Sequence, residues 1–313
     1  MPLNTNTQLC NNNNIHEFAP YILTDDSKLI IDQDWFNSLT DYIKDLIDKK
    51  LKGKYILDKV NIPHIYQIDN QDRLLTIVYQ SYLDGFDYNI WYSPDIPNGP
   101  KNVTIIQISD SEKKALLNKD VSSLIDLEKQ ISDKMINGNL YFIRLSSTSG
   151  KNEKPVRPFE RAKDIIEHLM SVKLFADREY NRDKDTCLIM MPWQQIISNR
   201  CEFRIFVVNN KLTAASPQIY WKEHSYTTDE LEVFQEVLSN IPFIDKVIYN
   251  TYVADVFIDI DTKQCHLIEL NPFGPASGAG SSLFNWISDY DILHGLNNEN
   301  NEAELRYLSI INF

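Results

Sequence analysis

The chain has 313 residues, of which 43% are hydrophobic and 11% aromatic, so it can form two compact lobes or one large domain. Its net charge of −13 argues against wrapping of double-stranded nucleic acid, because phosphate binding needs a basic face. The four cysteines include no CxxC pair and indicate neither a zinc site nor a disulfide framework. Neither an apolar run of about 18 residues nor a secretion signal is present. We therefore expect a cytoplasmic protein without membrane contact, monomeric when alone.

The first hundred residues contain few strong patterns. Apolar residues recur at helical spacing over residues 34–51. The stretch SPDIPNGP (93–100) contains three prolines and one glycine, which punctuate the chain. We therefore expect an N-terminal segment and lobe over residues 1–100 and a core domain over residues 101–313.

The core domain mixes strands and helices. In chain order, the patterns predict a strand at 103–108, a helix at 122–135, a strand at 139–144, a helix at 159–174 and a strand at 187–193. A hairpin is expected at 201–216, with a corner at Asn209 and Asn210 that tolerates positive φ. Thr227 and Glu230 form a capping box at the start of the next helix. Because no strict βαβ rhythm is present, the order favours an α+β or a mixed α/β protein, and we predict the α+β class.

Two carboxylates and one amide are expected to converge near the end of the chain. The strands at 252–260 and 264–270 are predicted to form an antiparallel hairpin. In that hairpin Asp255 lies opposite Glu269, and Asn271 shares their face because side chains alternate along a strand. Buried carboxylates repel each other unless one is protonated or a cation lies between them. This donor set suits Mg²⁺. The alternative is that the carboxylates flank a strand end and meet water or a basic side chain.

A phosphate-binding loop is the second candidate feature. The stretch IRLSSTSGK (143–151) contains Arg144, Ser146, Ser147 and Lys151 after an apolar strand. Backbone amides and hydroxyls of such a loop can cradle phosphate oxygens, while the cations offset their charge. The stretch is not a Walker loop, since GxxxxGK[ST] is absent, and a serine-rich surface turn is the alternative.

Two further positions are weaker candidates. In CEFRIFVV (201–208), Glu202 and Arg204 share one face of a strand. They form either part of the site or an internal ion pair at a sheet edge. Trp193 is most simply a packing residue.

Taken in order, the motifs FIRLSSTSG, LIMMPW, EFRIFVV, VADV and IELN resemble those of an ATP-grasp domain. The chain resembles more closely still the cell division cycle protein 123 family, a divergent ATP-grasp clade. The features are RLSS followed by a lysine loop, a hinge ending in Trp193, EFRIFV, and ELNPFG leading to SSLFNW. The resemblance covers about residues 103–290. Two residues depart from the family pattern: Glu269 stands where Asp is usual, and Arg144 where Lys is frequent.

This resemblance implies an ATP-grasp fold of two α+β lobes with the nucleotide between them, and ATP and Mg²⁺ as cofactors. It implies that phosphate would be bound by Arg144 and Arg204, adenine by the backbone of Met191 to Trp193, and the metal by Asp255, Glu269 and Asn271. It also implies a role in assembling eukaryotic translation initiation factor 2 through its γ subunit. The alternative is an active ATP-dependent carboxylate–amine ligase that modifies a protein or peptide.

Overall fold

The computed structural model describes residues 21–23, 29–38, 44–45, 48, 55–58, 82–149, 157–181, 184–194, 201–218, 226–274, 280–286, 288–296 and 303–307. Its residues fall into two compact units. The first unit comprises residues 1–86, 96–99 and 197–313, and the second comprises residues 87–95 and 100–196. The predicted division into 1–100 and 101–313 stays a prediction.

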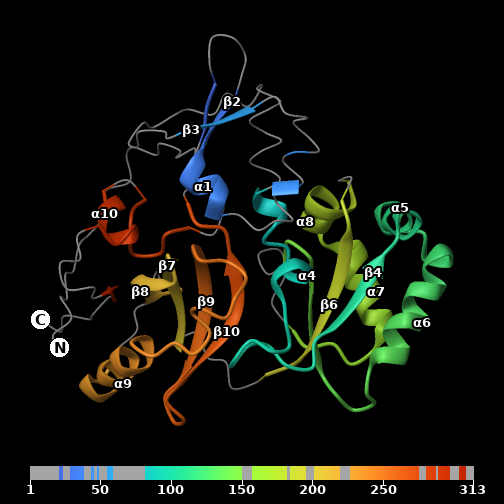
Figure 1. The fold of residues 1–313 in the computed structure, drawn as a ribbon. Helices are drawn as coiled ribbons and strands as arrows, with labels where there is room; N and C mark the ends of the chain where they lie inside the picture. Colours follow the sequence, from blue (N-terminus) through green and yellow to red (C-terminus); the bar gives the residue numbers. More distant parts are fainter. Residues whose placement is uncertain are drawn as a thin grey trace, which may run out of the picture. The chain divides into compact units, whose positions relative to one another are not determined.

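The second unit is built on an antiparallel sheet of three strands (Figure 1). Its strands are β4 (Thr104–Ile108), β5 (Tyr141–Leu145) and β6 (Thr186–Pro192), with β6 in the middle. They confirm the strands predicted at 103–108, 139–144 and 187–193. One face of the sheet carries Ile106, Ile143 and Leu188, which join the main hydrophobic core of the unit.

Helices supply the rest of this core. They are α5 (Asp110–Asn118), η1 (Val121–Leu124), α6 (Ile125–Lys134), α7 (Ala162–Ser171), α8 (Lys173–Phe175) and the π-helix η2 (Ala176–Tyr180). A short helix, α4 (Tyr88–Trp91), packs against β6. The prediction missed α5, although Ser109 and Glu112 form a capping box at its start.

The first unit contains a five-stranded sheet in the order β10-β9-β7-β8-β11. Its strands are β7 (Glu202–Val208), β8 (Lys211–Pro217), β9 (Tyr252–Asp259), β10 (Gln264–Asn271) and β11 (Glu304–Leu305). Strands β7 and β8 form the predicted hairpin, in which Asn209 and Asn210 have φ values of 52° and 59°. The capping box of Thr227 and Glu230 starts α9 (Thr228–Leu238), as predicted.

Helix α9 and the loop after β10 contact different side chains of β7. Phe203 of β7 packs against Phe234 of α9, with ring centroids 4.7 Å apart. Phe206 instead contacts Phe284 and Trp286, which follow β10. Because Phe203 and Phe206 are three residues apart, they lie on opposite faces of the strand. The loop after β10 therefore covers the face that also carries Arg204.

The remaining elements of the first unit are smaller. A second sheet contains β1 (Tyr21–Leu23), β2 (Leu29–Asp32) and β3 (Tyr55–Asp58). Helix α1 (Gln33–Ser38) covers the start of the helix predicted at 34–51, most of which lies outside the described residues. The last helix is α10 (Tyr290–Leu293).

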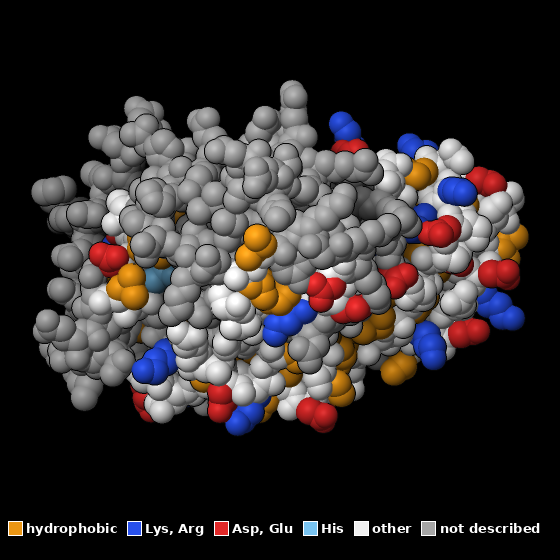
Figure 2. All heavy atoms as spheres, turned by 45° about the horizontal axis from the view of Figure 1, so that its top comes forward, with side chains coloured by type: hydrophobic (Ala, Val, Ile, Leu, Met, Phe, Trp, Pro, Cys, Tyr) orange, Lys and Arg blue, Asp and Glu red, His pale blue; other side chains and the backbone are white. Residues whose placement is uncertain are grey.

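Among the described residues, the helices are too short or too polar to cross a membrane. The described surface in Figure 2 mixes Lys and Arg side chains with Asp and Glu side chains.

Candidate functional site

Four polar residues lie side by side across the large sheet of the first unit. Asp255 on β9 is paired in register with Glu269 on β10 and with Arg204 on β7. Arg204 is in turn paired with Ser216 on β8. We call these four residues the polar row. The predicted pairing of Asp255 with Glu269 is confirmed, and a β-bulge at Ile268 sets the register there.

Within the polar row, Arg204 and Asp255 form a two-pronged ion pair. Arg204 Nε donates to Asp255 Oδ1 at 2.8 Å, and Arg204 Nη2 donates to Oδ2 at 2.9 Å. Gln218 Nε2 also donates to Oδ2, at 2.8 Å. The side chains of Arg204 and Asp255 are 11% and 5% exposed, so solvent screens their charges weakly. Asp255 therefore meets a basic side chain, which was the alternative to a metal site. The strand that carries Glu202 and Arg204, β7, lies inside the sheet, so its expected position at a sheet edge is wrong.

The loop after β10 lies over the polar row. Arg204 Nη1 donates to the carbonyl oxygen of Gly280 at 3.4 Å, and the amide of Leu283 donates to Ser216 Oγ at 3.5 Å. This loop is anchored by Arg306, which follows β11: it donates to the Leu283 carbonyl at 3.2 Å and to Asp289 at 2.8 and 2.9 Å. The conformation of the motif SSLFNW is thus tied to the polar row and to β11.

Two carboxylates of the polar row, together with the neighbouring Asn271, carry the kinds of oxygen atom that a magnesium ion prefers. Asp255, Glu269 and Asn271 lie on one face of the β9–β10 hairpin, and they offer carboxylate and amide oxygens. The Nδ2 atom of Asn271 is buried without a hydrogen-bond partner. Because an amide can turn to present its oxygen instead, this atom marks a polar position that a ligand can satisfy. Within the described residues, no group of three or more His, Cys, Asp and Glu side chains forms a metal cluster.

In the second unit, Arg144 is held at the end of β5. Its side chain is buried, its Nε donates to the Leu145 carbonyl at 3.3 Å, and its guanidinium lies 5.3 Å from the ring centre of Tyr88. The hydroxyl of Tyr88 also lies 3.3 Å from the sulfur of Met191. Tyr88 therefore links the predicted phosphate residue and the predicted adenine residue.

The predicted loop serines form hydrogen bonds inside the second unit. Ser146 Oγ accepts from the amide of Cys187 at 2.7 Å. The amide and hydroxyl of Ser147 both donate to Glu179 Oε1, at 2.7 and 2.6 Å. The amide of Trp193 donates to the Leu140 carbonyl at 2.8 Å, so the sheet uses this donor.

The remaining predicted positions divide as follows. Lys151 lies outside the described residues. The roles predicted for Arg144, Ser146, Ser147, Met191 and Trp193 stay predictions.

Sequence reasoning missed Gln218, Tyr88 and Glu179. Gln218 follows β8 directly and lies opposite Glu202 of β7, but its closeness to Asp255 depends on the pairing of β7 with β9. Tyr88 and Glu179 are far in sequence from the residues they contact, and no local pattern predicts those contacts.

Two buried cysteines have pKa values that make them poor nucleophiles. Burial raises the pKa of the Cys187 thiol above its usual value. Burial also raises the pKa of Cys265 to about 12. Both thiols stay protonated near neutral pH, whereas a nucleophilic cysteine needs its thiolate form.

The paired sheets and helices define an α+β protein, as predicted. The D123 family model matches residues 159–312 of the chain. A putative CDC123-like protein of Acanthamoeba polyphaga mimivirus is 24% identical over 293 residues, covering 85% of this chain and 87% of the relative. The resemblance to the cell division cycle protein 123 family is therefore confirmed.

Solved structures agree with this relation. Cdc123 from Schizosaccharomyces pombe superposes with a TM-score of 0.57 at 19% identity, covering 73% of this chain and 97% of that chain. A C-terminally truncated form of the same protein superposes with a TM-score of 0.56, also at 19% identity, covering 73% of this chain and 97% of that chain. At this identity the superpositions establish the fold alone.

Proposed function

We propose that this protein binds ATP with Mg²⁺ and assembles eukaryotic translation initiation factor 2 through its γ subunit, in the cytoplasm. The nucleotide part rests on the polar row, in which Glu269, Asp255 and Arg204 occupy adjacent strands. Acidic oxygens and a guanidinium are the groups that a metal–triphosphate needs. The assembly role rests on the family relation, and the net charge of −13 favours docking on a basic protein face.

In this proposal each residue of the site has one task. Asp255, Glu269 and Asn271 would hold the magnesium ion, which when bound offsets the negative charge of the phosphates. Arg204 would bind a phosphate oxygen through Nη1, which faces the loop after β10. Gln218 would orient Asp255, because its hydrogen bond at 2.8 Å leaves the carboxylate less freedom to rotate.

The polar row also explains how a carboxylate is tolerated at Asp255. Its side chain is 5% exposed, and an unpaired charge at such a position would be costly. Arg204 compensates this charge directly. On binding of a metal–triphosphate, the metal would take over that compensation for Asp255, and the phosphate would do so for Arg204.

The first experiment measures Mg-ATP binding by calorimetry, using the purified full chain and its Glu269→Gln variant. We expect the variant to lose at least about tenfold in affinity, because losing one metal ligand weakens the metal–phosphate bridge. The control is Glu236→Gln, since Glu236 forms an exposed pair with Lys263. Equal affinity in all three proteins would refute the assignment of Glu269.

The second experiment addresses the partner. Purified γ subunit of initiation factor 2 is offered to the immobilised chain with Mg-ATP and with EDTA. We expect capture that is stronger with Mg-ATP. Failure of capture in both conditions would remove the assembly role while leaving the nucleotide site standing.

An ATP-dependent carboxylate–amine ligase is the second candidate. It is favoured by Glu269, since glutamate at this position is the more common residue in the wider ATP-grasp enzymes that the chain resembles. Release of ADP only when amino acids, peptides or protein acceptors are supplied would favour this activity over the assembly role.

A further inference from the structure

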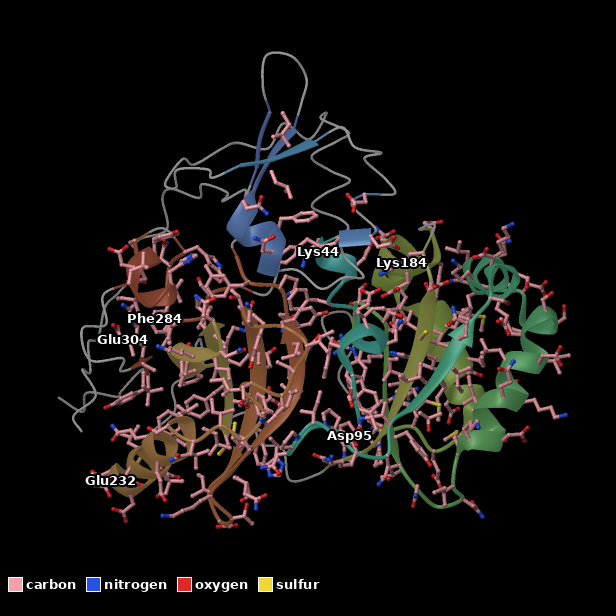
Figure 3. The ribbon with its side chains drawn as sticks, in the orientation of Figure 1. Lys44, Asp95, Lys184, Glu232, Phe284 and Glu304 are labelled. Carbon is pink, nitrogen blue, oxygen red and sulfur yellow. The ribbon has the colours of Figure 1, made fainter. Side chains whose placement is uncertain are left out.

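Three charged side chains are buried together in the second unit. Lys184, labelled in Figure 3, lies just before β6. Its Nζ is 2.9 Å from Asp87 Oδ2 and 3.5 Å from Glu179 Oε2. The side chains of Lys184, Asp87 and Glu179 are 10%, 7% and 0% exposed. We call these three residues the lysine network.

Stability alone is a poor explanation for this network. Moving a charged side chain from water into a protein core is costly in free energy, and apolar residues of similar volume often stabilise the core equally well. The surrounding core of the second unit is apolar, with many fully buried aliphatic side chains. The network is therefore better explained by what its two carboxyl groups hold in place.

Glu179 holds the loop that follows β5. Its Oε1 accepts both the amide and the hydroxyl of Ser147, at 2.7 and 2.6 Å. Glu179 belongs to the π-helix η2, and π-helical turns are rare and frequently occur at functional sites. The hydroxyl of Thr186 bonds the Glu179 carbonyl at 3.4 Å, so the backbone of this turn is also attached to β6.

Asp87 holds a second segment next to Arg144. It directly precedes α4, whose first residue is Tyr88. The amide of Tyr88 donates to the Ser146 carbonyl at 2.8 Å, and its ring faces the Arg144 guanidinium. Lys184 thus connects the segment that carries Tyr88 with the residue that holds the loop after Arg144.

We infer that the lysine network is a positioning device, which fixes Arg144 and the following serines for binding an anionic phosphate group. Glu179 acts through Ser147, and Lys184 acts through Glu179 and Asp87, so both are positioning residues. This inference rests on the proposed nucleotide binding. It also gives Ser147 a different task from the one predicted, because its hydroxyl holds the loop to Glu179.

The test compares the wild type with Glu179→Ala and Glu179→Gln. Calorimetry gives the affinity for Mg-ATP, and hydrogen exchange gives the protection of the Ser147 amide. We expect Glu179→Ala to weaken binding roughly 10- to 100-fold, as supporting residues of a site typically do, and to speed exchange at Ser147. Glu179→Gln keeps an oxygen acceptor, so it should restore most of the protection. Asp164→Asn is the control, because Asp164 pairs with Arg161 on the surface of the same unit.

Ser147→Ala covers the case in which the Glu179 variants do not fold. It leaves the three charges of the network paired and removes a single hydrogen bond, so the fold should persist while affinity falls several-fold. Unchanged Mg-ATP affinity in Ser147→Ala and in a folded Glu179→Ala would overturn the inference.

The two proposals fail in distinguishable ways. A wild type that does not bind Mg-ATP would contradict the proposed function, and the positioning role would then be judged by exchange alone. In that case, slow exchange at Ser147 in folded Glu179→Ala would overturn it as well.

Discussion

Replacing Asp255 with asparagine probes the polar row with the least change in shape. In the wild type, the carboxylate accepts two hydrogen bonds from Arg204 and one from Gln218. An asparagine amide has one oxygen acceptor, and its NH₂ group would face a donor of the guanidinium. Arg204 would then be a buried charge with an incomplete partner.

The expected loss follows from the burial of this pair. Removing one partner of a buried ion pair costs about 3–5 kcal/mol, and the oxygen that asparagine retains puts Asp255→Asn near the lower end. At roughly 2–4 °C per kcal/mol for a large domain, the melting temperature should fall by roughly 6–12 °C. Mg-ATP at about 100 times its Kd should stabilise the wild type by about 2.7 kcal/mol. The variant should lose this added stabilisation, because one metal ligand has lost its charge.

The assay is thermal unfolding of both proteins, each with and without saturating Mg-ATP. Comparing the ligand-induced shift within each protein separates lost binding from lost stability. Asp245→Asn is the matched control, since Asp245 forms an exposed pair with Lys246. A full wild-type shift in Asp255→Asn would refute the assignment of the metal ligand. An unchanged melting temperature without ligand would refute the energetic role of the ion pair.

Two further predictions concern His294 and Gly295 of the first unit, and Gly138 of the second unit serves as a control. Burial lowers the pKa of His294 from 6.5 to about 4, so the unfolded chain binds its proton more readily, and stability present above pH 6.5 is lost as pH falls toward 4. His294→Phe should therefore flatten the decline of melting temperature over this window, because it removes at most about 3 kcal/mol of pH-dependent stability; an unchanged profile would contradict this. Gly295 has φ of +68°, and an added Cβ would lie 2.9 Å from Thr213 Cγ2. Gly295→Ala should cost about 2–3 kcal/mol in denaturant unfolding, and Gly138→Ala, strained but in open space, about 1 kcal/mol; equal losses would argue against the steric contact.

Several features of the fold were predictable because they depend on neighbouring residues. Side-chain alternation and a short turn predicted the pairing of Asp255 with Glu269, which the structure reaches through a β-bulge at Ile268. Asn209 and Asn210 tolerate positive φ, and they form the corner of the first hairpin. The same kind of local signal at Ser109 and Glu112 marks the start of α5, which the prediction overlooked.

The partners of the site residues were not predictable in the same way. Pairing of β7 with β9 places Arg204 beside Asp255, although 51 residues separate them in the chain. Strand alternation shows which residues share a face of one strand, but it does not show which strand becomes the neighbour.

Most strands, the caps, the acidic hairpin and the family resemblance could be predicted from the sequence, because each depends on residues close together in the chain. Which charges meet became known from the folded structure. Arg204 compensates Asp255, and Lys184 joins Asp87 to Glu179, since burial makes each of these charges dependent on a partner from a distant segment. The residue types of the candidate site can therefore be recognised from short stretches of sequence. The arrangement of their side chains in space depends on packing between distant segments.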